Sequence, residues 1–348
     1  MFKRAPGPLA ETLSQLLALV NERQNPNINA LWRIAKDIEG IKLNIKMFGY
    51  ELARQLGTQL PAHDVLEPSI VGLRSKPSTQ SDMEAAWVAY WSRRLGISVI
   101  YHRKIWELCY VLQALWEHGV LLEGSKGLGF GCGKEPIPSL LAAFGCQVTM
   151  TDLEPEQAQA KGWVGTQQHA TQVDAGHHPH LVDATTFGQR VELQYVDMND
   201  IPDTLRGYDF CWSICSFEHL GSIANGLRFV ESSLKTLRPG GVAVHTTEFN
   251  FLNDASTIDN WPTVLFQRGH FVDLAQHLTA QGHSVCELDF DVGHGPMDRF
   301  VDLPPYGHDM TGALREIWAG PAPHLKLMLD GFASTCFGLI IKKGSAAA

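Results

Sequence analysis

The stretch KGLGFGCGKEP, residues 126–136, places a glycine at every second position: Gly127, Gly129, Gly131 and Gly133. An apolar segment precedes it and a helix-like segment follows it. Glycine adopts backbone conformations that other residues avoid, and it lets a ligand approach the main chain closely. In an open α/β sheet, ligands bind beyond the carboxyl ends of the strands, where such a turn lies. We therefore expect Gly129, Gly131 and Gly133 to line a site for a nucleotide-like ligand.

The glycine spacing does not match two common nucleotide-binding loops. The dinucleotide fingerprint G-x-G-x-x-G fails because no glycine stands at the sixth position, whichever glycine is counted first. The phosphate-binding loop fails because Gly133 and Lys134 are followed by Glu135. A glutamate at the start of a helix also competes with a phosphate for the helix N-terminus. The loop therefore suits a ligand with an ammonium group better than a nicotinamide or flavin dinucleotide.

Segments typical of strands and helices alternate from residue 126 onward. The expected strands cover 126–131, 146–151, 191–196, 208–214, 241–248, 284–291 and 334–342, and the expected helices cover 134–144, 155–162, 222–237 and 269–281. This alternation predicts a doubly wound α/β sheet. The last two strands have no helical pattern between them. Residues 290–330 form instead a long loop rich in glycine, proline and histidine, which we expect to contact the substrate.

Residues 1–60 are expected to be helical and to form a separate segment. Their apolar residues recur at alternating spacings of three and four: Leu31, Ile34, Ile38, Ile41, Ile45, Phe48 and Leu52. This is the a/d seam of a heptad repeat. It predicts either a helix that packs on its own domain or a segment that joins the subunits of a homo-oligomer, and both interpretations remain open.

Residues 61–119 are expected to form a linker and lid-like helices, before a ligand-binding domain at 120–344. The spacing of Ser81 and Glu84 matches a capping box, which predicts a helix from about Asp82 to Gly96. A second helix is expected over 102–118, close to the glycine loop. Such a helix could close over a ligand.

The overall composition narrows the class of protein. The chain has 348 residues, of which 45% are hydrophobic and 19% charged, and its net charge of −9 disfavours nucleic acid as a partner. Its seven cysteines are scattered and form no C-x-x-C pair, which indicates free thiols in a reducing compartment. We see neither a signal peptide nor an apolar run long enough for a membrane span. We therefore expect a cytoplasmic protein.

Asp152 follows the second expected strand, where a carboxylate can accept hydrogen bonds from a ribose diol. It could instead cap the next helix. With the glycine loop it begins an ordered set of motifs: GFGCG, Asp152, VDMND, YDFCWSICSFEHL and LRPGGVAVHTTEF. This set resembles the motifs of class I S-adenosylmethionine-dependent methyltransferases, and the resemblance covers about residues 120–285.

The resemblance implies a seven-stranded Rossmann-like sheet with an antiparallel last strand, and S-adenosylmethionine as the cofactor. It implies that Gly129, Gly131 and Gly133 pass close to the methionine part of that cofactor. It further implies a ribose contact from Asp152, with Leu153 beside it. Adenine contacts would come from Asp197 and Met198, and Ser213 is a further candidate for the cofactor site.

One position departs from the family pattern. An acidic residue usually stands where this chain has Gly129, and it contacts the amino group of the cofactor. We expect Glu135 to supply that charge from the other side of the loop. Arg103, on the preceding helix, is expected to bind the carboxylate of the cofactor, although a solvated basic face is the alternative interpretation.

Methyl transfer to a hydroxyl requires an aligned acceptor and a group that takes its proton. The candidates at the carboxyl ends of the fourth and fifth strands are Glu218, His219, His245 and Glu248. His219 is the first candidate for the base, but the pair Glu218 and His219 could instead cap a helix. Alternation along the fifth strand places His245 and Glu248 on opposite faces, and His245 fits a structural role as well.

A closer resemblance concerns a bacterial subgroup associated with surface-polysaccharide and glycan biosynthesis. It is carried by YHRKIWELCYVLQAL, GLGFGCGKEP, GWVGTQQHA, EHLGS and HTTEFN, and it would extend over about residues 80–342. It implies a sugar or glycan precursor as the acceptor of an O-methylation. A divalent metal ion that orients vicinal hydroxyls is an alternative device, but no residues have fixed metal-ligand spacing, so no metal is expected. Methylation of another small metabolite at oxygen, nitrogen or carbon, or a non-catalytic cofactor-binding scaffold in a biosynthetic complex, remain alternatives.

Overall fold

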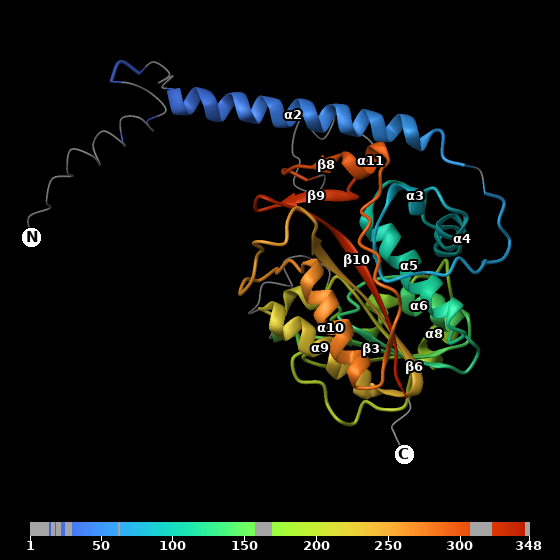
Figure 1. Ribbon diagram of the computed structural model, residues 1–348. Helices are drawn as coiled ribbons and strands as arrows, with labels where there is room; N and C mark the ends of the chain where they lie inside the picture. Colours follow the sequence, from blue (N-terminus) through green and yellow to red (C-terminus); the bar gives the residue numbers. More distant parts are fainter. Residues whose placement is uncertain are drawn as a thin grey trace, which may run out of the picture. The chain divides into compact units, whose positions relative to one another are not determined.

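The computed structural model describes Ser14, Ala18 and residues 22–24, 30–61, 63–156, 169–306 and 322–344. The chain divides into two compact units, Met1–Arg54 and Gln55–Ala348, and each is treated by itself (Figure 1). Most of the helix expected over 155–162 and residues 307–321 of the expected substrate loop lie outside the described residues. Among the described helices, none is long and apolar enough to cross a membrane.

Helix α2 (Ala30–Gly57) carries the predicted heptad seam. Four seam residues expose between 44% and 76% of their surface: Ile38, Ile41, Ile45 and Phe48. The side chains of Leu31 and Ile34 lie outside the described residues. The described part of the seam is therefore an exposed apolar stripe.

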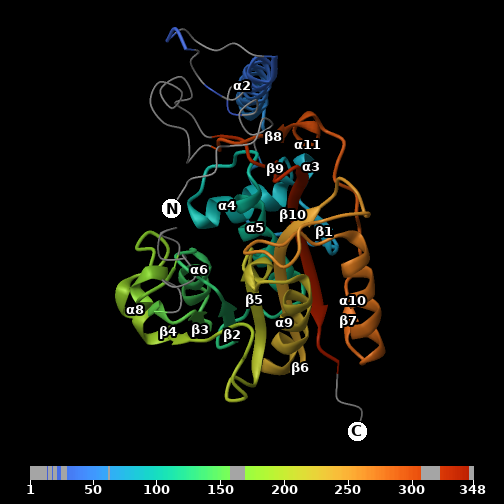
Figure 2. The ribbon, with the colours of Figure 1, turned by 90° about the vertical axis from the view of Figure 1, so that its left-hand side faces the viewer.

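The second unit is built on one mixed sheet (Figure 2). Its strands are β1 (Lys76–Pro77), β2 (Lys126–Phe130), β3 (Gln147–Asp152), β4 (Val191–Tyr195), β5 (Tyr208–Ile214), β6 (Leu237–Asn250), β7 (Ser284–Val285), β8 (Val301–Asp302), β9 (Lys326–Leu329) and β10 (Phe332–Lys342). The order is β4-β3-β2-β5-β6-β10-β9-β8, and β1 and β7 also pair with β10. Strands β2 to β6 are parallel, and β10 is antiparallel to β6. The predicted sheet with an antiparallel last strand is confirmed.

The helices of this unit are α3 (Gln80–Met83), α4 (Ala86–Leu95), α5 (Arg103–Glu117), α6 (Ile137–Ala143), α8 (Ala184–Arg190), α9 (Ile223–Thr236), α10 (Arg268–Ala280) and α11 (Pro296–Arg299). Helix α6 packs on β3, α9 on β5 and β6, and α5 on β5, β6 and β10. The alternation along β6 shows that α5 and α9 cover opposite faces. His245 contacts Ser233 of α9, whereas Thr246 contacts Glu107 of α5.

Aromatic residues fill the core on the α9 face of the sheet. Phe229 meets the ring of Phe130 edge-on, and Phe271 stacks on Phe337 with ring centroids 4.3 Å apart. All four side chains are at least 99% buried. Each such burial contributes about 1.5–3 kcal/mol, which holds β2, β6 and β10 together beneath the ends of the strands.

Two local predictions were wrong. The strand expected over 284–291 ends after Val285, because the segment before α3 takes the place beside β10. Lys76 and Pro77 pair with β10, and Ser75 bridges Leu288 instead. The capping box expected at Ser81 is also absent.

Thr79 is instead the N-cap of helix α3. It has an extended backbone, and its side chain accepts a hydrogen bond from the Asp82 N–H at 3.2 Å. Helix α3 then ends at Met83, and α4 begins separately at Ala86.

Candidate functional site

A cavity of about 430 Å³ opens at the carboxyl ends of β2, β3 and β5. The glycine loop contributes Gly131, Gly133 and Glu135 to its wall, and the ends of β3 and β4 contribute Asp152, Leu153, Asp197 and Met198. Seven of the residues predicted for a cofactor therefore surround one space. Gly131 and Gly133 have positive φ angles of 61° and 53°, so the loop turns through conformations that favour glycine.

Gly129 is a glycine for a different reason. A Cβ atom at this position would lie 2.4 Å from the indole of Trp212 and 2.3 Å from the Cys132 sulfur. The space beside the strand is therefore filled, and Gly129 itself does not line the cavity. The Trp212 Nε1–H donates a hydrogen bond to Glu135 Oε1 at 2.6 Å. The indole thus excludes a side chain at residue 129 and holds a carboxylate at residue 135.

Glu135 is an unusual carboxyl group. Burial raises its pKa to about 8, although the Trp212 N–H and the charge of Lys104 both act in the opposite direction. Lys104, from the first turn of α5, lines the same cavity. The cavity therefore has a carboxyl group and an ammonium group on its wall, which together complement the two charged groups of an amino acid.

Asp152 joins the glycine loop to the end of β3. Its Oδ2 accepts hydrogen bonds from the backbone N–H groups of Gly133 at 3.2 Å and Ala170 at 2.9 Å. Its Oδ1 accepts one from the Leu153 N–H at 2.8 Å. Burial raises the pKa of Asp152, whereas these backbone donors lower it. Asp152 thus has two roles, since it lines the cavity and holds the loop in place.

His169 is a wall residue that the predicted set lacked. It is 9% exposed, and its Nε2 lies 2.6 Å from the carbonyl oxygen of Leu153. A carbonyl only accepts, so Nε2 carries the proton and the buried Nδ1, which has no hydrogen-bond partner, is an acceptor. The position of His169 after the second strand favours a lid or a wall beside the adenine, but it does not show which way the ring turns.

His219 also lines the cavity, from the short 3₁₀ turn η3 (Phe217–His219) that follows β5. Its Nδ1 lies 3.0 Å from the Pro262 carbonyl oxygen and 3.2 Å from Thr263 Oγ1. Because the carbonyl only accepts, Nδ1 donates. In the neutral ring Nε2 then carries the lone pair, and it lies 3.9 Å from Glu218 Oε1. The arrangement therefore provides an imidazole base whose tautomer is fixed by the backbone.

His245 and Ser213 lie away from the cavity. His245 is fully buried, with Nδ1 2.8 Å from Ser213 Oγ and Nε2 3.0 Å from Ser233 Oγ. Burial lowers its pKa to about 3. The neutral imidazole of His245 therefore links β5, β6 and α9 through two serine hydroxyls. His245 and Ser213 are structural residues of the core.

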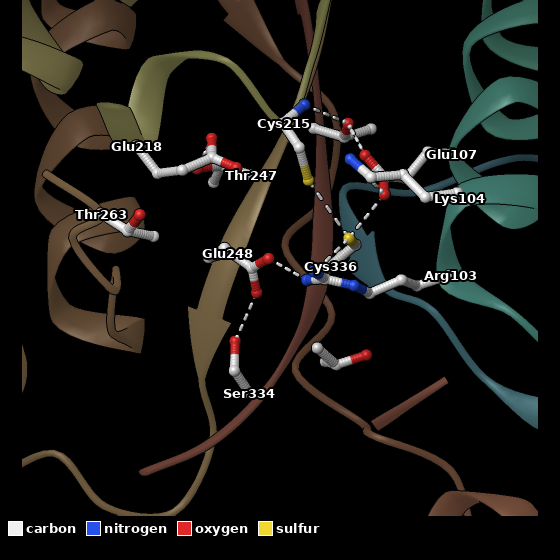
Figure 3. A network of polar contacts seen from close by, with 12 residues as sticks. Arg103, Lys104, Glu107, Cys215, Glu218, Thr247, Glu248, Thr263, Ser334 and Cys336 are labelled. Atoms are coloured by element: carbon white, nitrogen blue, oxygen red, sulfur yellow. Dashed lines mark hydrogen bonds and ion pairs between the residues drawn. The ribbon is translucent and has the colours of Figure 1, made fainter. Parts of the chain in front are cut away.

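Arg103 and Glu248 are not among the residues that line the cavity, and they form an ion pair with each other (Figure 3). The side chains are 11% and 5% exposed. Ser334 Oγ donates to the other oxygen of Glu248 at 2.7 Å. Arg103 was expected at the carboxylate of a cofactor, but its guanidinium points to β6, and its neighbour Lys104 reaches the cavity instead. Glu218 is buried as well, and its Oε2 accepts a hydrogen bond from Thr247 Oγ1 at 3.0 Å.

Comparison with known proteins gives one direct match. A family model described as a methyltransferase domain matches residues 101–287, more than half of the chain. No curated protein matches the chain.

Several solved structures are similar in fold. The [4+2]-cyclase SpnF is 16% identical, over 79% of this chain and all of that chain, with a TM-score of 0.43. A phosphoethanolamine N-methyltransferase from Haemonchus contortus is 14% identical, over 74% of this chain and 57% of that chain, also with a TM-score of 0.43. At such values neither protein's activity transfers to this chain.

Proposed function

Because the chain belongs to the methyltransferase-domain family, we propose that it is an S-adenosylmethionine-dependent O-methyltransferase that acts on a hydroxyl of a sugar or glycan precursor. The observation that supports this most is the shared cavity. Seven of the residues expected to bind the cofactor line the same space as the His219 imidazole. Methylation at oxygen requires a base, and the tautomer of His219 suits that task.

The residues present fit this cofactor. Asp152 would accept hydrogen bonds from the ribose, with Asp197 and Met198 at the adenine. Glu135 would face the ammonium group of the methionine part, and Lys104, in the role first expected of Arg103, would face its carboxylate. The positive-φ glycines leave room for the ligand against the main chain.

The bound cofactor supplies a methyl group that is activated by a sulfonium. His219 Nε2 would accept the proton of the acceptor hydroxyl as its oxygen attacks that methyl group. The Pro262 carbonyl, which accepts from Nδ1–H at 3.0 Å, would stabilise the imidazolium that forms.

The first test is calorimetric titration with S-adenosylhomocysteine, with NAD⁺ as a control. We expect micromolar binding of the first and none of the second. Failure to bind S-adenosylhomocysteine would contradict the proposal.

The second test is turnover with a panel of sugar and glycan-precursor hydroxyls. His219→Ala should lower kcat by ~10²-fold or more while leaving the affinity for S-adenosylhomocysteine unchanged. His277→Ala, on the exposed surface of α10, is the matched control and should be as active as the wild type. Methylation at nitrogen or carbon, or binding without turnover on any acceptor, would favour the two alternatives to this function.

We also propose that α2 joins two copies of the chain. The exposed stripe of Ile38, Ile41, Ile45 and Phe48 supports this, since apolar stripes at a/d positions pair in coiled coils. Asp37 and Lys42 flank the stripe at positions that meet between parallel helices. Light scattering should show a dimer that Ile41→Glu converts to a monomer. Ile70→Glu, at an exposed site outside α2, should leave the mass unchanged.

A further inference from the structure

The thiols of Cys215 and Cys336 are in contact within the network of polar side chains in Figure 3. Cys215 follows β5 and lines the cavity, and Cys336 lies in β10. Their sulfur atoms are 3.4 Å apart. A disulfide has an S–S distance of about 2.05 Å, so the two sulfur atoms need to approach by roughly 1.4 Å.

The two thiols differ in their freedom to move. Cys336 is fully buried and fixed in the middle of β10, where it pairs with Glu248 of β6. Cys215 sits in the turn after β5, with a φ angle of 42°, and its N–H is bonded to Thr246. Because it lines the cavity, a small oxidant reaches Cys215 first.

Glu107 of α5 provides a proton acceptor for the second thiol. The Cys336 S–H donates to Glu107 Oε1 at 2.8 Å, and Thr246 Oγ1 donates to Oε2 at 2.6 Å. Burial opposes ionisation of Glu107, but the charges of Lys104 and Arg103 outweigh it and hold the pKa of this carboxyl below its usual range. Burial meanwhile raises the pKa of the Cys336 thiol. Cys336 therefore needs a base in order to react, and an ionised one is in contact with it.

We propose that Cys215 and Cys336 form an intramolecular disulfide when the protein meets a peroxide, with Glu107 as the proton acceptor. The Cys215 sulfur takes one oxygen from hydrogen peroxide and becomes a sulfenic acid, and the peroxide is reduced to water. The Cys336 sulfur then attacks the Cys215 sulfur as its proton passes to Glu107. Hydroxide leaves, takes that proton, and departs as a second water. In total two thiols and one peroxide give one disulfide and two waters.

The same atoms are close enough to hold a metal ion. The ligand atoms of Glu107, Cys215 and Cys336 lie within 4.8 Å of one another. However, Lys104 Nζ is 3.5 Å from Glu107, and Arg103 Nη1 is 3.8 Å from Cys336. Two fixed positive charges at this range repel a divalent cation. They also oppose the burial that raises the pKa of both the Cys215 and the Cys336 thiol.

The first experiment maps the disulfide. Full-length protein is treated with hydrogen peroxide, free thiols are alkylated, and proteolytic fragments are weighed by mass spectrometry. We expect a linked pair of peptides that contain Cys215 and Cys336, two hydrogens lighter than the separate peptides. In Cys336→Ser, Cys215 should instead be trapped as a sulfenic acid. Cys286→Ser, which removes a half-buried thiol elsewhere, should still form the link.

Two outcomes would overturn the proposal. One is that both thiols are fully alkylated after peroxide treatment. The other is that Cys215 links to a different cysteine. Glu107→Gln tests the proton acceptor, and we expect it to slow the linking step about tenfold while the sulfenic acid forms at the wild-type rate. If Glu107→Gln forms the disulfide at the wild-type rate, Glu107 is not the proton acceptor. The peptide map of the wild-type protein does not depend on whether this variant folds.

Because Cys215 lines the cavity, the disulfide should weaken cofactor binding, a consequence that rests on the proposed function. We expect the oxidised protein to bind S-adenosylhomocysteine about tenfold more weakly, with recovery after reduction by dithiothreitol. Cys336→Ser should lose this response. If the reduced protein does not bind S-adenosylhomocysteine, the proposed function fails, while the peptide map still decides whether the disulfide forms. Equal affinity in both states would show that the disulfide does not alter the site.

Discussion

The two sides of the site are built in different ways. The cofactor side depends on main-chain turns and on residues close in sequence, from the glycine loop to Asp152, with backbone N–H groups as the main donors. The region behind it depends on side chains from α5, β6 and β10, and Glu107 meets Cys336 across 229 positions. A site can thus have one side fixed by local backbone geometry and another fixed only when distant segments pack.

The largest effect is expected from Glu248→Ala. The substitution leaves Arg103 buried without its carboxylate, and breaking a buried ion pair costs ~3–5 kcal/mol. The free energy of unfolding from urea denaturation measures this loss. Arg206→Ala breaks an exposed ion pair with Asp203 and should cost no more than ~1 kcal/mol. Similar losses in the two variants would contradict the view that packed side chains hold this region.

Gly129→Ala should come next. The added methyl group overlaps the Trp212 indole and the Cys132 sulfur, and overpacking of this kind costs ~1–3 kcal/mol. Gly188→Ala is the matched control, since nothing lies within 4 Å of its added Cβ in α8. It should be neutral or slightly stabilising, because alanine favours helices. A neutral Gly129→Ala would show that the cofactor side tolerates a side chain there.

Asp152→Ala should lower the affinity for S-adenosylhomocysteine by about tenfold or more, because it removes an acceptor and frees the loop N–H groups. Calorimetric titration measures the change. Asp183→Ala removes the N-cap of α8 and should lower stability by ~1 kcal/mol without changing affinity. Unchanged affinity in Asp152→Ala would exclude the predicted ribose contact.

The smallest effect is a pH dependence that Glu135 imposes. With its pKa at about 8, this carboxyl is protonated in the free protein at pH 6–7, and an ammonium group favours its ionised form. Binding then releases a proton, so the affinity for S-adenosylhomocysteine should rise by nearly tenfold between pH 6 and pH 7. Glu135→Gln should abolish most of this slope. If the affinity of Glu135→Gln still rises with pH, the proton released on binding comes from another group.

The same carboxyl affects stability with the opposite sign. Its pKa is raised in the folded protein, so the folded state binds the extra proton between the unfolded pKa, near 4.5, and about 8. The free energy of unfolding should therefore fall as the pH rises through that range. Glu135→Gln should reduce this fall when unfolding by urea is followed at pH 5 and pH 8.

Local patterns predicted most of the sheet and seven of the residues that line the cavity, because strand alternation and glycine spacing act through neighbouring residues. They did not distinguish Arg103 from Lys104. Adjacent residues of a helix point about 100° apart, and only the rotation of α5 on the sheet decides which one reaches the cavity. The sequence likewise did not distinguish Thr79 from Ser81 as the N-cap of α3. Both residue types favour this position, and Thr79 is the one with the extended backbone that an N-cap requires.

The Trp212 indole and the thiol pair were beyond prediction for another reason. Nothing in the spacing of YDFCWSIC shows that Trp212 fills the space beside Gly129. Likewise, the meeting of Cys215 and Cys336 depends on β10 inserting beside β6. Such contacts are set by the register between strands, and the order of residues within one strand does not encode that register.

The position of β10 also bears on the order in which the protein is made. Until residues 332–342 have left the ribosome, β6 is an unpaired edge with a row of buried, apolar residues and free backbone groups. The glycine loop and β2 to β5 have emerged well before that point. During synthesis the nascent chain can thus hold most of the cavity wall beside an unpaired, aggregation-prone strand edge. Cys336 and Ser334 are added only with β10, the strand that pairs with this edge.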